Sequence, residues 1–259
     1  MKNKKRLKAL LKIHNKEVAD ARMNKLPRIL LDLKENKLSR DKLIQIISTR
    51  YQVAHFFEDM LRLIINIIKN ESYIPNNIRT KLLYSAEQNL KEELGEIIEY
   101  GGPHQTGREV FLNSLGIDYC EWKKNLGTYE DFGRVATSAK KLLKKLKSLI
   151  SKGAVEAVST LWYYENRISL DGINGDYHIL LNAFEERFPE FKKEKYTEGD
   201  PLWHIASHSN HDEYHAQIAE AGLTECTSIS GTEKKIISTC IEAKKVLDTF
   251  WNDCYKEIK

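Results

Sequence analysis

Three side chains with metal-binding chemistry lie close together near the C-terminal end of the chain. The segment reads His208-Ser-Asn-His211-Asp212-Glu-Tyr-His215. Each residue of an α-helix turns by about 100°, so Asp212 and His215 would lie about 40° and about 20° to either side of His208. Neutral imidazoles and a carboxylate on one narrow face suit divalent transition metals such as iron or manganese. The spacing therefore predicts a metal site formed by His208, Asp212 and His215.

Two more histidines, His204 and His211, fall within an arc of about 100° around the same helix face. Half of the eight histidines therefore lie in this one stretch. We expect these two to hydrogen-bond to the metal ligands or to contact a substrate. The alternative interpretation is a surface helix that exposes all of these polar side chains to solvent.

Two other segments offer further ligands. Glu92 and Glu93 precede a Gly-Gly-Pro break, and His104 follows that break. Glu165 lies in an apolar and aromatic run, where burying an unpaired carboxylate costs free energy that a metal ion would offset. In the alternative interpretation, Glu92 and Glu93 are a solvated acidic pair, and Glu165 forms an ion pair with Arg167 or a lysine.

The order of these residues resembles the heme-oxygenase-like diiron oxidases, also called iron-containing redox enzymes. The pattern is Asn89-Leu-Lys-Glu92-Glu-Leu-Gly95, then His104, then Tyr-Tyr164-Glu165, then His208-x3-Asp212-x2-His215. It covers residues 40 to 225, and the wider fold also includes thiaminase II and the pyrroloquinoline quinone synthase. The apolar periodicity of the chain predicts an all-α domain of seven to nine helices, and the resemblance implies that they form a heme-oxygenase-like bundle.

The resemblance also implies a set of metal-binding and catalytic residues. These are Glu92, His104, Glu165, His208, Asp212 and His215. The preceding Asn89-Leu90 favours Glu92 over Glu93, without deciding between them. The implied cofactor is a pair of iron ions, with a Mn/Fe pair as the alternative. The p-aminobenzoate-forming members carry a lysine about one helix length after the glutamate, where this chain has Asp171 to Gly175, so the resemblance does not favour that reaction.

The implied activity is that of a non-heme diiron oxidase or oxygenase. It would take O2 as co-substrate, electrons from an external donor, and a small organic substrate resembling an amino acid, a fatty acid or a cofactor precursor. One alternative is a metal-independent, thiaminase II-like hydrolase with Glu165 as acid or base and a cysteine nucleophile. The other is a non-enzymatic interaction protein with a vestigial metal site. A homodimer is an expectation from the fold alone.

Composition and charge narrow the class of protein. Hydrophobic residues make up 41% of the 259 residues, charged residues 30%, and only five residues are proline. This mixture is typical of a globular helical protein. No apolar run approaches the ~18 residues that span a bilayer. The net charge of +4 is too mild to indicate nucleic-acid binding. Four cysteines without CxxC spacing predict free thiols and a cytoplasmic location.

Apolar periodicity and helix start and stop signals divide the chain into elements. Residues 1–38 are expected to form a basic helical extension, and residues 39–259 a single bundle domain with the metal site. The bundle helices are expected at about 42–69, 75–98, 104–116, 118–125, 128–150, 154–168 and 177–188, followed by the His-rich helix from Pro201 and a last helix from Ser230. Ser39 is the expected N-cap of the first of these, and capping boxes are expected at Thr128-Tyr-Glu-Asp131 and Ser230-Gly-Thr-Glu233.

Overall fold

A computed structural model describes residues 27–97, 102–169 and 175–259, apart from the side chains of residues 169 and 210–213. The described residues form eleven α-helices and one 3-10 helix, with no strand among them. The helices are α2 (Arg28–Lys34), α3 (Arg40–His55), α4 (Phe57–Asn70), α5 (Asn76–Glu93), α6 (His104–Ser114), α7 (Tyr119–Lys124), α8 (Thr137–Ile150), α9 (Ala154–Ser169), α10 (Asp176–Arg187), η3 (Pro189–Phe191), α11 (Trp203–Cys226) and α12 (Thr232–Glu257). The predicted all-α bundle is confirmed.

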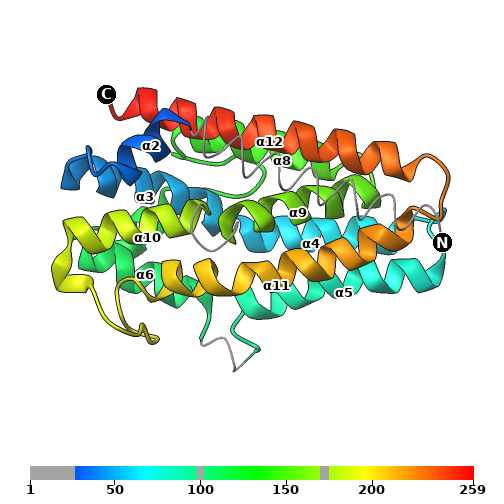
Figure 1. The fold of residues 1–259 in the computed structure, drawn as a ribbon, viewed down its shortest axis with the longest axis horizontal. Coiled ribbons are helices and arrows are strands. Elements are labelled where there is room, and N and C mark those ends of the chain that lie inside the picture. Colours follow the sequence, from blue (N-terminus) through cyan, green and yellow to red (C-terminus); the bar gives the residue numbers. More distant parts are fainter. Residues whose placement is uncertain (1–26, 98–101, 170–174) are drawn as a thin grey trace.

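The long helices lie roughly along one axis, with α8 and α12 on one side and α5 and α11 on the other (Figure 1). Helix α9 runs between these two sides and packs against α11, α12 and α8. Its described side chains are nearly all buried, because its sequence is apolar around most of its circumference. A central helix of this kind fixes the positions of the helices that surround it.

Several local signals place the helices where the sequence predicts them. The Ser39 hydroxyl accepts a hydrogen bond from the backbone N–H of Lys42 at the start of α3. The Asp118 carboxylate accepts one from the backbone N–H of Glu121 at the start of α7. Each side chain satisfies a backbone donor that has no partner within its helix. The predicted N-cap at Ser39 is confirmed.

The predicted helix over residues 42–69 is wrong at one point. At Phe56 the backbone takes φ −94° and ψ 8°, and the chain divides into α3 and α4. The Phe56 ring is buried and packs edge-on against Phe132, with ring centroids 5.5 Å apart. Periodicity continues across the break because both helices turn their apolar residues toward the same core. The division adds one helix to the count.

The predicted capping box at Thr128–Asp131 does not begin a helix. The Asp131 carboxylate accepts hydrogen bonds from the backbone N–H groups of Thr128 and Gly133, which closes a turn. Phe132 within this turn has a positive φ of 56°, which a helix does not allow. Helix α8 therefore begins only at Thr137.

The second predicted capping box, Ser230 to Glu233, marks a helix start but does not form. Gly231 is the N-cap of α12, with a φ of 83°, and no side chain caps the helix there. The Thr232 hydroxyl instead donates to the carbonyl oxygen of Ile229. The Gly residue supplies the left-handed backbone conformation that the turn requires.

The predicted N-terminal extension is described only in part, since residues 1–26 lie outside the described residues. Helix α2 belongs to the bundle core, because it packs against α10 and α12 and buries Ile29, Leu30 and Leu33. Among the described residues, no helix is long and apolar enough to cross a membrane.

A buried arginine joins three helices on the α12 side of the bundle. The Arg167 guanidinium of α9 lies 3.3 Å from Asp176 of α10 and 2.6 Å from Asp248 of α12. The indole N–H of Trp251 also donates to Asp176, at 2.9 Å. Burial alone would raise the pKa of Asp248, but Arg167 and Lys244 outweigh it and hold the pKa below its usual value. The network therefore stabilises the protein while Asp248 is ionised.

Replacing Arg167 by Met should lower the free energy of unfolding by about 3 kcal/mol or more, because two carboxylates lose their buried cation. Urea unfolding near pH 7 measures this change. The deficit should shrink below about pH 4, where the carboxylate stabilisation is lost from the wild type as well. Arg62→Met is the control, because the exposed Arg62–Glu58 pair should contribute under about 1 kcal/mol. Equal losses in both variants would contradict the role of the network.

Candidate metal centre

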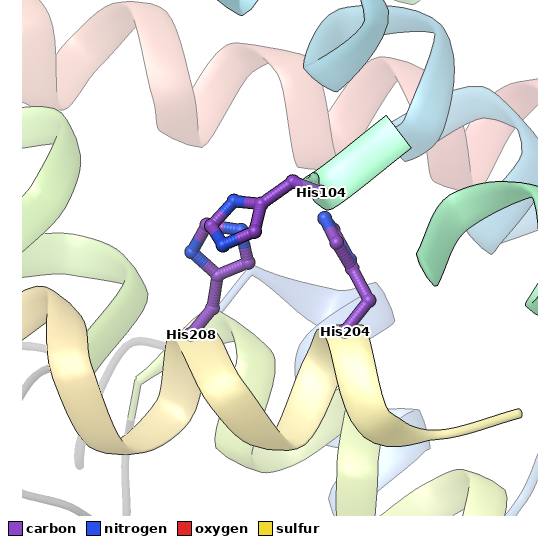
Figure 2. Close-up of side chains that lie close together, drawn as sticks. All are labelled: His104, His204 and His208. Atoms are coloured by element: carbon purple, nitrogen blue, oxygen red, sulfur yellow. The ribbon is translucent and has the colours of Figure 1, made fainter. Parts of the chain in front are cut away.

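Three buried histidines meet where α6 approaches α11. His104 is the first residue of α6, and Figure 2 shows His204 and His208 projecting from α11 toward it. Each of the three offers a ring nitrogen, and these nitrogens all lie within 4.8 Å of one another. His204 and His208 reach the same place because residues four apart lie one above the other on a helix. The cluster combines residues from two distant parts of the chain.

Glu92, near the C-terminal end of α5, brings a carboxylate into the same place. Its Oε2 lies 2.6 Å from Nε2 of His215, and its Oε1 lies 3.5 Å from Nε2 of His104. Glu92 is only 2% exposed. Neither carboxylate oxygen, nor Nε2 of His104, has an aligned hydrogen bond to a described residue. Buried polar atoms that converge in this way fit a metal ion, which accepts lone pairs from all of them.

Glu93 has different partners although it is the next residue. Its Oε1 lies 3.0 Å from Nδ1 of His104, and its Oε2 accepts a hydrogen bond from Arg108 at 3.2 Å. A ligating histidine commonly donates its second ring N–H to a carboxylate, which fixes the ring and leaves the first nitrogen for the metal. The contacts therefore favour Glu92 as the ligand and Glu93 as the carboxylate that orients His104.

His204 has protein partners at both ring nitrogens. Nδ1 lies 3.0 Å from the Tyr51 hydroxyl, and Nε2 lies 3.5 Å from Nη1 of Arg108. These contacts leave His204 with less capacity to bind a metal than His104, despite its place in the cluster. His208 is held in another way, since the Tyr177 ring stacks on it with centroids 5.2 Å apart.

Burial and neighbouring charges set the protonation of the cluster. Burial lowers the pKa of His204 and of His208 well below the usual value, and nearby positive charge lowers both further. Burial would lower the pKa of His104 as well, but the carboxylate of Glu93 outweighs it and raises that pKa. Burial would raise the pKa of Glu92, but His215 and the other histidines hold it below its usual value. Neutral imidazole and ionised carboxylate are the forms that bind metals, so the lowered pKa values favour binding at His208 and Glu92, whereas at His104 a metal would have to displace a proton.

Of the six predicted ligands, the structure brings together Glu92, His104, His208 and His215. Glu165 is fully buried on α9, the helix that packs along α11. Its role as a ligand stays a prediction.

Asp212 and His211 lie on α11, and their side chains are outside the described residues. Asp212 therefore also stays a prediction as a ligand, and His211 as a residue beside the site.

Two residues of the centre were missed by sequence reasoning, Arg108 and Tyr177. Arg108 follows His104 by four residues, so the sequence spacing places both on one face of a helix. Tyr177 reaches His208 from α10, and no spacing in the sequence indicates that contact.

Of the aromatic residues beside Glu165, Tyr164 lines two described cavities that are too small for a substrate. Tyr164 lines two small cavities, each of about 10 Å³, one beside Arg50 and Trp251 and the other beside Phe57 and Leu146. Such a volume is about that of one water probe. A substrate in either cavity would require the lining side chains to move.

Three of the four cysteines are poorly suited to act as nucleophiles. Cys226, Cys240 and Cys254 are buried, and burial raises the pKa of each thiol, to about 12 for Cys226 and Cys254. The thiolate is the reactive form of cysteine, so a raised pKa makes these side chains inert. Cys120 is exposed on α7.

No protein-family model and no curated protein sequence matches this chain. The resemblance to the diiron oxidases therefore depends on the residues and their spacing.

Gly107 of α6 lies in close approach to α11 at the centre. A Cβ atom there would lie 2.8 Å from the Trp203 ring and 2.8 Å from Cβ of His204. Gly107 therefore lets α6 pack closely enough on α11 for His104 to meet His208.

Gly107→Ala should lower the free energy of unfolding by about 1–3 kcal/mol, although alanine is the better helix former. It should also weaken Fe(II) binding, because α6 would move away from α11. Thermal unfolding and an anaerobic Fe(II) titration measure the two effects. Thr106→Ala is the control, since Thr106 is exposed on the same turn. A more stable Gly107→Ala variant with unchanged Fe(II) affinity would contradict the close packing.

Proposed function

We propose that this chain is a non-heme diiron oxidase that uses O2 to oxidise a small organic substrate. The observation that carries the proposal is the convergence of the Glu92 carboxylate with the Nε2 atoms of His104 and His215 in a buried site. Two histidines and one carboxylate with further positions open are the donor set of many non-heme iron oxygenases. The mixed nitrogen and oxygen donors support iron over a metal that prefers thiolates.

The placement of Glu92 also supports two ions over one. Its two oxygens face different histidines, so one carboxylate is available to both halves of the site. His208 lies against His104, with ring centroids 4.4 Å apart, and adds another imidazole. Glu165 and Asp212 are the carboxylates that we expect to complete the pair, as in diiron sites within helical bundles.

When bound, the iron pair would supply the redox chemistry that reduces O2, with electrons from an external donor. The side chains prepare the site for this task. Glu93 holds the His104 ring so that Nε2 faces Glu92. Tyr177 covers one face of His208 and limits its rotation. The burial of all these groups excludes bulk water. Electrostatic interactions within the site are therefore screened less than they would be in solvent.

Glu92→Gln should reduce iron to less than half of the wild-type content, because the amide offers a neutral and weaker ligand in place of a carboxylate. Protein reconstituted with Fe(II) without oxygen is assayed for iron per chain and then for O2 uptake. The wild type should hold about two irons. Glu87→Gln is the matched control, since Glu87 is an exposed carboxylate of the same helix that pairs with Lys69. Full iron in Glu92→Gln would contradict the ligand assignment.

Glu165→Gln and Asp212→Asn test the second half of the pair. Each should lower the iron content from about two per chain to about one, because the ligands around Glu92 are retained. The same iron assay measures both, with circular dichroism to verify the helical fold. Two irons retained in both variants would remove Glu165 and Asp212 from the ligand set. Iron bound by the wild type without O2 uptake would favour a structural metal over an oxidase.

A further inference from the structure

Arg108 is placed one helical turn after His104, with its guanidinium inside the metal centre. The residue is 6% exposed. Its Nη1 lies 3.2 Å from Oε2 of Glu93 and 3.5 Å from Nε2 of His204. The guanidinium also faces Tyr119 of α7. One buried cation therefore touches side chains of α5 and α11 at once.

The two atoms that Arg108 contacts are themselves suitable for metal binding. Glu93 is a carboxylate adjacent to Glu92, and it lies against His104. His204 offers a ring nitrogen within 4.8 Å of those of His104 and His208. Without Arg108, both would be available as ligands beside those already assigned. Something in the centre must select among these donors.

An arginine is suited to that selection. Its guanidinium donates hydrogen bonds and accepts none, and it stays charged at all physiological pH values. A carboxylate oxygen or imidazole nitrogen that accepts its N–H has a lone pair less available for a metal. The fixed positive charge also repels a metal cation at close range.

We infer that Arg108 is a positioning residue that keeps Glu93 and His204 out of the metal's ligand set and holds Glu93 where it orients His104. The inference rests on the proposed metal centre. It assigns different tasks to two adjacent carboxylates, with Glu92 as ligand and Glu93 as support. It also positions His204 between Arg108 and Tyr51 instead of among the metal ligands.

Co(II) is the probe, because its visible absorption depends on the number and type of its ligands, and the measurement requires no turnover. Arg108→Met should change the spectrum of bound Co(II), because His204 is released to coordinate. Arg108→Met/His204→Phe should return the spectrum toward that of the wild type, since the added ligand is removed. Arg108→Lys should retain the wild-type spectrum, because it keeps a cation between Glu93 and His204.

Arg108→Met leaves the buried Glu93 without its cation, so the same comparison is also made in an Arg108→Met/Glu93→Gln background, where both charges are removed. A wild-type spectrum in Arg108→Met would overturn the inference. A changed spectrum that His204→Phe does not reverse would also overturn the inference. The same spectral change in Arg108→Lys would overturn it as well. If the wild type binds no Co(II) and no Fe(II), the metal centre itself is refuted. If it binds Co(II) but the variants match it, only the role of Arg108 fails.

Discussion

The burial of two adjacent carboxylates at the end of α5 is the constraint on which the centre depends. Glu92 and Glu93 are both removed from water, and an ionised carboxylate is costly to bury without compensating partners. Adjacent residues on a helix point about 100° apart, so the two carboxylates share only His104 among the ion-pair contacts of the described residues, and they face different nitrogens of its ring. Glu93 is compensated by Arg108 and one nitrogen of His104. Among the described side chains, Glu92 has ion-pair contacts with the histidines His104 and His215, and a metal ion would complete its compensation.

The rest of the bundle holds these groups at the required separation. Helix α9 is buried along its length and sets the position of α11, while Gly107 allows α6 to approach α11 closely. His104 is the first residue of α6, so the start of that helix determines where its ring lies. On the opposite side of α9, Arg167 ties α9 to α10 and α12. Helix α10 in turn carries Tyr177 to His208. The fold and the centre are therefore coupled through a few close contacts.

Much of this arrangement could be predicted from the sequence. The remainder could not, and the reasons are physical. The helical class and the grouping of His208 with His215 follow from periodicity, because spacing along one helix fixes which residues share a face. The choice between Glu92 and Glu93 depends on which partners surround each, and these come from α6 and α11. The turn at Thr128 has the sequence pattern of a capping box, but the Asp131 carboxylate closes a turn there and no helix begins. Local patterns predict local geometry, and contacts between distant helices require the packed structure.

The most direct test of the metal centre is anomalous diffraction at the iron absorption edge, on crystals of Fe(II)-loaded protein. The account predicts strong anomalous peaks within bonding distance of the Glu92 carboxylate and of Nε2 of His104 and His215, with Glu93 remaining on Arg108. Two peaks would establish the pair, and one would limit the site to a single ion. An iron-loaded crystal whose peaks all lie on the protein surface, with Glu92 bonded only to histidine N–H groups, would contradict the account.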